Sequence, residues 1–147
     1  MAKYRKLSHT VYCCKYHIVF VPKYRLRILE SVLADFVEDQ IRTISEWKEV
    51  EIDELNVQRD HVHMVCSIPP KLSVSDYMGI LKGKTAIKML KTFPTLKKKK
   101  YWGNHFWARG YFVSTVGLDE DMIKRYVKHQ EKQEKQREQD SKEYKLF

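Results

Sequence analysis

Residues 61–68 alternate between two kinds of side chain, and this alternation restricts the fold more than any other stretch. Neighbouring side chains of an extended strand point to opposite faces. One face therefore carries His61, His63, Val65 and Ser67, and the other carries Val62, Met64, Cys66 and Ile68. An apolar strand face has to be covered by other elements. Pro69 and Pro70 end the strand.

Three other segments read as strands and two as helices. Residues 10–21 and 106–116 are rich in β-branched and aromatic side chains, and residues 50–58 turn at Arg59-Asp60 into the histidine strand as a hairpin. Residues 31–48 carry an apolar stripe at helical spacing that includes Trp47. A capping-box pattern, Ser73-x-x-Asp76, begins a second helix that ends before Pro94.

The order strand, helix, strand, strand, helix, strand predicts an α+β fold of the ferredoxin-like (RRM-like) type. This fold is a four-stranded antiparallel sheet with two helices on one face. We expect the apolar face of residues 61–68 to lie under those helices, with His61 and His63 on the open face. A further helix from about Asp119, carrying Tyr126, is predicted to cover that open face.

Length and composition indicate one domain, residues 1–147, with a core of about 10–130 and a charged tail at 131–147. A hydrophobic content of 43% with 12% aromatic residues excludes a disordered chain. No apolar run approaches the roughly 18 residues of a membrane span, so no membrane partner is expected. Three cysteines without a Cys-x-x-Cys pattern suit reduced thiols, and we expect a cytoplasmic location.

The net charge of +9 is concentrated in the body of the chain. Residues 1–27 hold seven basic and no acidic residues, whereas the tail holds five of each. Such an excess favours contact with a phosphate backbone, although a solvated lysine face would look the same. The candidate DNA-binding residues are Lys3, Arg5, Lys6, Lys84, Lys88, Lys91, Lys97, Lys98, Lys99 and Lys100.

The histidine pair allows two interpretations. Two imidazoles two residues apart on a strand can bind one metal ion, or they can simply hydrogen-bond to neighbours. On the last predicted helix, Tyr126 and Gln130 are four residues apart and so adjacent. They either pack as part of an amphipathic face, or supply an amide oxygen as third ligand and a phenol for attack on a phosphodiester. His9 and His17 have no spacing that indicates a role.

These residues resemble a known family. The His61-Val62-His63 motif, Tyr126 with Gln130, and residues 101–117 (YWGNHFWARGYFVSTVG) are similar to the small single-tyrosine HUH transposases of bacterial and archaeal insertion sequences. Residues 73–76 and 81–84 also resemble that family. The resemblance extends from about Thr10 to Gln130, and nothing at the motif positions departs from the family pattern.

The resemblance implies a homodimer that binds single-stranded DNA hairpins at element ends. It implies that Tyr126 cuts one strand through a 5'-phosphotyrosine bond, with a divalent metal on His61, His63 and Gln130 and no nucleotide cofactor. Mixed histidine and amide ligation suits Mg²⁺ or Mn²⁺. The family also implies that the tyrosine helix can serve the partner subunit, and that residues 107–116 join the two subunits in a shared sheet.

Two other functions remain open from the residues. The first is a non-catalytic protein that binds nucleic-acid hairpins on the same fold, which would bind without metal and tolerate His61→Ala. The second is a metal phosphoesterase that uses water and forms no covalent adduct with DNA.

Overall fold

The structure is a computed structural model, and it describes residues 4–7, 10–98 and 105–116. The elements in chain order are β1 (Arg5–Leu7), β2 (Thr10–Tyr12), β3 (Lys15–Phe20), the 3-10 turn η1 (Lys23–Arg25), α1 (Ser31–Trp47), β4 (Glu51–Gln58), β5 (His61–Ser67), α2 (Val74–Thr92), the 3-10 turn η2 (Pro94–Lys98) and β6 (Phe112–Thr115). The predicted helix with Tyr126 and Gln130, and the tail after it, lie outside the described residues.

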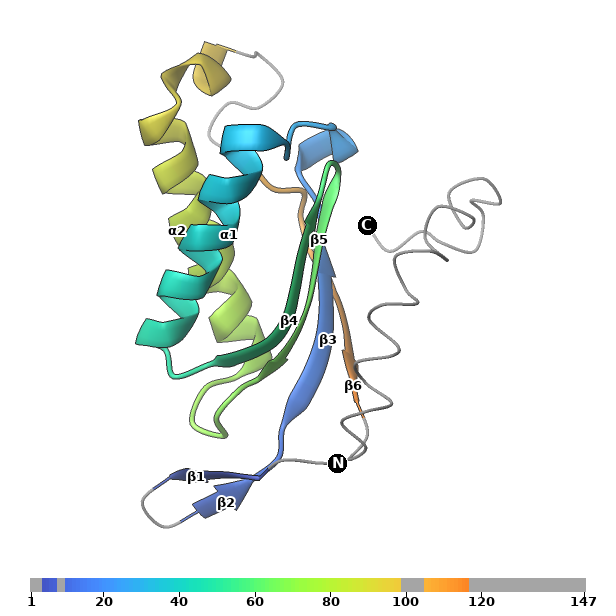
Figure 1. Ribbon diagram of the computed structural model, residues 1–147, viewed down its shortest axis with the longest axis vertical. Helices are drawn as coiled ribbons and strands as arrows, with labels where there is room; N and C mark the ends of the chain where they lie inside the picture. Colours follow the sequence, from blue (N-terminus) through green and yellow to red (C-terminus); the bar gives the residue numbers. More distant parts are fainter. Residues whose placement is uncertain (1–3, 8–9, 99–104, 117–147) are drawn as a thin grey trace, which may run out of the picture.

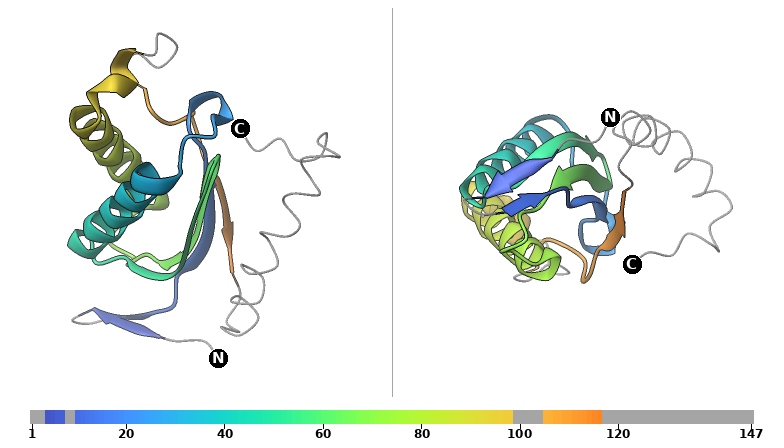
Figure 2. Two further views of the ribbon diagram at one scale, coloured as in Figure 1. Left: turned by 45° about the horizontal axis from the view of Figure 1, so that its top comes forward. Right: turned by 90° about the horizontal axis from the view of Figure 1, so that it is seen from below.

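The main sheet has four strands in the order β4-β5-β3-β6, and every neighbouring pair is antiparallel. Helices α1 and α2 lie side by side on one face of this sheet (Figures 1 and 2). The predicted α+β fold, a four-stranded antiparallel sheet with two helices on one face, is confirmed, and so is the hairpin that joins β4 to β5.

The hydrophobic core fills the space between the sheet and the two helices. Its members on β5 are Val62, Met64 and Cys66, and those on the neighbouring β3 are Ile18 and Phe20. The helices contribute Val37, Ile41, Ile44, Met78, Leu81 and Met89, all at most 1% exposed. The alternation in residues 61–68 therefore orients β5 as predicted, because its apolar side chains can leave water only on the helix side.

Helix α2 begins as its sequence predicts. The Ser73 hydroxyl accepts a hydrogen bond from the Asp76 backbone N–H at 2.9 Å, which satisfies one donor of the first helical turn. One turn later the buried Tyr77 hydroxyl lies 2.6 Å from the Ser45 hydroxyl of α1. These two contacts set where α2 starts and how it sits against α1.

The prediction of one continuous strand over residues 10–21 is wrong. Cys13 and Cys14 interrupt it, and the chain changes partner at this point. β2 pairs with β1 in a separate two-stranded arm, whereas β3 joins the main sheet (Figure 1). The Arg5 guanidinium on β1 reaches back to the Glu51 carboxylate at 2.6 Å, so an ion pair ties the arm to β4.

The prediction of a strand over residues 106–116 is also too long. Only β6, at its end, pairs continuously with β3. Trp107 forms an isolated bridge with Pro22, and between this bridge and β6 lies Gly110 with a φ of 79°. A left-handed φ is strained for most side chains and easy for glycine, so the chain bends here before it enters β6.

Side chains of α2 hold residues 105–111 in place. The Lys82 ammonium donates hydrogen bonds to the carbonyl oxygens of Ala108 and Gly110, both at 2.7 Å. The buried Trp107 indole N–H donates to the Thr85 hydroxyl at 2.8 Å. Burial lowers the pKa of Lys82 below its ordinary value. The segment is therefore held against α2 before β6 begins.

Trp47 does not belong to the buried stripe predicted for α1. It is the last residue of the helix and is 66% exposed, whereas Val37, Ile41 and Ile44 of the same helix are buried. Helical spacing places a residue on a face but does not say how far along the helix the partner elements reach. At Trp47 the chain already turns toward β4 through Glu49, whose φ is 59°.

The structure predicts unequal reactivity of the three free thiols. Cys66 is fully buried, whereas Cys13 and Cys14 are half-buried. Burial raises the pKa of the Cys66 thiol, and the nearby Asp53 carboxylate raises it further. Because the thiolate is the reactive form, we expect a thiol reagent to modify Cys13 and Cys14 in the native protein and Cys66 only after denaturation. Mass spectrometry after timed labelling measures this, and rapid native labelling of Cys66 would contradict it.

Candidate metal centre and nucleic-acid interface

His61 and His63 lie on β5 with their side chains on the sheet face opposite the helices, as their alternation with core residues predicts. Their rings are 4.9 Å apart between centroids and within 13° of parallel. Both are buried, at 6% and 0% exposed, so the expected open, polar face is not exposed at these residues. The structure thus brings the two predicted ligands together in a sheltered position.

The structure adds a third histidine that sequence reasoning missed. His17 on β3 is fully buried, and its ring lies 6.1 Å from that of His63 and 6.1 Å from that of Phe112, edge-on to both. In the register between β3 and β5, Val19 pairs with His63 and His17 pairs with Val65. His17 is two residues from Val19, so it lies on the same face as His63 and diagonal to it. The alternation of β3 could have placed His17 on this face, but only the register places it beside His63.

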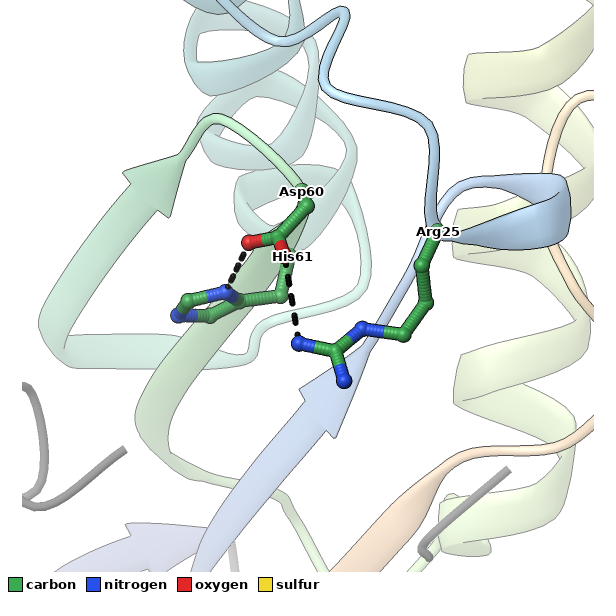
Figure 3. Close-up of polar contacts among 3 residues, drawn as sticks. All are labelled: Arg25, Asp60 and His61. Atoms are coloured by element: carbon green, nitrogen blue, oxygen red, sulfur yellow. Dashed lines mark hydrogen bonds and ion pairs between the residues drawn. The ribbon is translucent and has the colours of Figure 1, made fainter. Parts of the chain in front are cut away.

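Asp60, in the turn before β5, contacts both His61 and an arginine. One Asp60 carboxylate oxygen lies 2.7 Å from Nδ1 of His61, and the other lies 3.1 Å from a guanidinium nitrogen of Arg25. Figure 3 shows the carboxylate between the two side chains. Sequence reasoning singled out neither Arg25 nor Asp60 as a site residue, although Asp60 directly precedes the histidine motif.

Arg25 sits in an unusual backbone conformation. Tyr24 and Arg25 have φ values of 63° and 50°, in the left-handed region that non-glycine residues rarely adopt. Such residues cost about 1–3 kcal/mol each and persist only where the surroundings enforce them. Here the Lys23 backbone N–H donates to the Phe106 carbonyl at 2.9 Å, and that of Arg25 donates to the Pro22 carbonyl at 2.8 Å.

The histidine pair fits a divalent metal in spacing and ligand type, and its near-parallel rings would rotate for both to direct a nitrogen at one ion. Imidazoles bound to one ion at about 2.1 Å would have ring centres about 5 Å apart, close to the 4.9 Å between His61 and His63. A histidine pair held on a rigid strand loses little freedom on binding an ion. Within the ranges that the structure describes, no group of three or more His, Cys, Asp or Glu side chains could hold a metal. The predicted third ligand, Gln130, lies outside those ranges.

The predicted DNA-binding residues on α2 do not lie around the histidines. Lys84, Lys88 and Lys91 are exposed on α2, which lies on the opposite face of the sheet from His61 and His63. In the arm, Lys6 is exposed, whereas the Arg5 side chain is 13% exposed and paired with Glu51. Lys97 and Lys98 belong to η2. The other predicted contacts, Lys3, Lys99 and Lys100, are outside the described residues, as is Tyr126.

Among the described helices, none is both long enough and apolar enough to cross a bilayer.

Together, these features define a class: a small α+β protein with two helices on one sheet face and a buried histidine pair on the other. The family described as "Transposase IS200 like" matches residues 10–130. The transposase for insertion sequence element IS200 of Salmonella typhimurium is 45% identical over 95% of this chain and 91% of its own length. The ISDra2 transposase TnpA of Deinococcus radiodurans is 33% identical over 84% of this chain and 89% of its own. The chain belongs to the IS200-like transposase family.

Solved structures agree with this assignment. The crystal structure of a Deinococcus radiodurans R1 protein assigned as a transposase has a TM-score of 0.71 and 32% identity, over 86% of this chain and 97% of the other. A REP-associated tyrosine transposase bound to a REP hairpin has a TM-score of 0.55 over 88% of this chain and 74% of the other. At 15% identity this second similarity shows the fold alone.

Proposed function

We propose that this transposase cleaves and rejoins one DNA strand through a 5'-phosphotyrosine bond on Tyr126. His61, His63 and Gln130 hold a divalent metal ion, Mg²⁺ or Mn²⁺, in this proposal. The observation that carries it is the buried histidine pair, 4.9 Å apart on one sheet face, in a chain of the IS200-like family. A merely structural pair of histidines would not need to be adjacent and sheltered on a face away from the core.

The strand, the tyrosine and the metal would each have a separate role in the proposed reaction. The strand holds His61 and His63 rigidly, because β5 is paired on both edges, to β4 and to β3. The Tyr126 oxygen would form a bond to the phosphorus as its hydroxyl proton is lost. The bond from phosphorus to the 3' oxygen of the preceding nucleotide would break, and this oxygen would take up a proton and leave as a free 3'-OH. A bound divalent ion would neutralise charge on the phosphate oxygens and orient the leaving oxygen. Since the phosphotyrosine ester keeps the energy of the broken bond, a different 3'-OH can reverse the step, and no nucleotide cofactor is needed.

The proposed partner is a hairpin in single-stranded DNA at the element ends. Support comes from the basic excess of the chain and from the exposed lysines of α2. The REP-associated transposase of similar fold was solved with a REP hairpin. Protonated lysines attract phosphates regardless of sequence, so hairpin shape and unpaired bases would supply the selectivity.

We also propose a homodimer. In the described sheet β6 is an edge strand, with β3 on its one paired side. Edge backbone groups can pair with a second copy of the same strand, which would join the two subunits in one sheet. The tyrosine helix of one subunit could then serve the histidine pair of its partner.

The test is formation of a covalent adduct. A single strand containing an imperfect hairpin from the flanking DNA is labelled at its 3' end and incubated with the protein and Mn²⁺, and a labelled protein band is sought in a denaturing gel. A 5'-phosphotyrosine retains the 3'-side fragment, so the 3' label should move to the protein and a 5' label should not. A strand with a scrambled hairpin and a reaction with a chelator are the controls.

Other outcomes would point to the other functions. Cleavage without any protein adduct would favour the water-using phosphoesterase. Hairpin binding that needs no metal and survives His61→Ala, without cleavage, would favour a non-catalytic binding protein. Either result would overturn the proposed reaction.

A further inference from the structure

We infer that Asp60, backed by Arg25, is a positioning residue that holds His61 with Nδ1 protonated, so that Nε2 carries the lone pair that binds a ligand. This inference deepens the proposed function and rests on it for the identity of that ligand. The contact itself is independent of it: a carboxylate oxygen lies 2.7 Å from Nδ1 of His61 (Figure 3).

The chemistry of the contact decides which nitrogen carries the proton. A carboxylate can only accept a hydrogen bond, so Nδ1 of His61 has to be the donor. A neutral imidazole has one N–H, and its lone pair is then on Nε2. A histidine that binds a metal through one nitrogen usually donates from the other to a carboxylate or carbonyl, which fixes the ring and makes it a better ligand.

Arg25 holds the carboxylate in that orientation. Its guanidinium lies 3.1 Å from the second oxygen of Asp60, and the two side chains are 38% and 13% exposed. Two partners on two different oxygens fix the plane of the carboxylate. The ring of His61 is stacked on that of His63, so an orientation set at Asp60 also sets how the two rings face each other.

The backbone explains how an arginine 35 positions earlier reaches this turn. The left-handed residues Tyr24 and Arg25 form a tight reversal just after β3. Shortly after it, the backbone N–H of Leu29 donates to the Arg59 carbonyl at 2.9 Å, which joins this loop to the turn between β4 and β5. The strained backbone is therefore stabilised by contacts on both sides of Arg25. This backbone conformation lets the Arg25 side chain reach Asp60.

The alternative role for Asp60 is to stabilise the β4–β5 turn without orienting His61. Substitutions distinguish these two roles. Asn suits a hairpin turn as well as Asp does, and its carbonyl oxygen can still accept from Nδ1. Asp60→Asn should therefore keep the orientation of His61 but lose the contact with Arg25, because the amide nitrogen cannot accept a hydrogen bond. Asp60→Ala should lose the orientation of His61 as well. Arg25→Ala leaves the turn residues unchanged and should cause a smaller loss in the same direction. Asp39→Ala and Arg42→Ala, both at exposed positions of α1, are matched controls.

The first measurement uses the metal-free protein. Long-range ¹H–¹⁵N NMR of the imidazoles, in a mildly alkaline buffer, reports which nitrogen of His61 carries the proton. We expect Nδ1–H in the wild type and in Asp60→Asn, and a shift toward Nε2–H in Asp60→Ala. A wild-type His61 in the Nε2–H form, or an unchanged tautomer in Asp60→Ala, would overturn the inference. Circular dichroism melting confirms that each variant is folded.

The second measurement is Mn²⁺ affinity, followed by the electron paramagnetic resonance of free Mn²⁺. Asp60→Ala should weaken binding about 10–100-fold, the usual effect of removing such a partner, and the α1 controls should not. Equal Mn²⁺ affinity in wild type and Asp60→Ala would refute the positioning role. If the wild type binds no Mn²⁺ at all, the proposed metal site fails, and the tautomer measurement still decides whether Asp60 orients His61.

Discussion

Replacing Tyr126 with phenylalanine should abolish the covalent protein–DNA adduct and leave hairpin binding unchanged. The change removes one oxygen, the proposed nucleophile, and keeps the aromatic ring. Loss of the nucleophile should lower the rate of adduct formation by at least about 10³-fold, because residues that act together in one chemical step lose nearly the whole effect when one is removed. A denaturing gel measures the adduct, and a mobility shift under native conditions measures binding.

The matched control is Tyr24→Phe, which also removes one phenol oxygen. Tyr24 is 64% exposed in the turn after β3, so its hydroxyl is accessible to DNA and yet has no place in the proposed chemistry. It should form the adduct at the wild-type rate. An adduct that persists in Tyr126→Phe would show that another side chain attacks the phosphorus, and peptide mapping of the labelled fragment would identify it.

The largest expected loss of stability comes from Phe20→Ala. Phe20 is fully buried on β3 at the sheet–helix interface, with its ring 4.7 Å from that of Trp107 and edge-on to it. Truncation removes the ring from the core and leaves a cavity that the paired strands cannot close. The free energy of unfolding should fall by about 3–5 kcal/mol.

Equilibrium denaturation in urea measures this loss at a single protein concentration, because the apparent stability of the proposed dimer would depend on concentration. The control is Ile87→Ala on α2, where the side chain is 67% exposed. It should change stability by no more than about 0.5 kcal/mol. A loss for Phe20→Ala no larger than that of Ile87→Ala would mean that the sheet–helix interface is not packed as the structure shows.

Local sequence patterns correctly predicted those elements whose buried face or start follows from residues close together in the chain. The alternation from His61 to Ile68 placed the histidines on one face and the core residues on the other, and the capping pattern at Ser73 located the start of α2. These signals are reliable because one residue's neighbours along the chain determine them. The two catalytic and ligand candidates on the last predicted helix, Tyr126 and Gln130, remain predictions.

Where the sequence-based predictions were wrong, the deciding contact was between distant segments. A strand-like composition over residues 10–21 could not show that β2 pairs with β1 while β3 pairs within the main sheet. Trp47 fits the helical stripe and is exposed because the partner elements end before it. In residues 106–116, hydrogen bonds from Lys82 to backbone carbonyls compete with strand pairing.

By itself, the amino-acid sequence determined the fold class, the order of elements and the face on which His61 and His63 lie, since the period of each segment is local. Only the tertiary structure placed His17 beside His63, and Arg25 and Asp60 behind His61. Those neighbours depend on strand register and on a left-handed turn, and both are chosen by the packing of segments that are far apart along the chain.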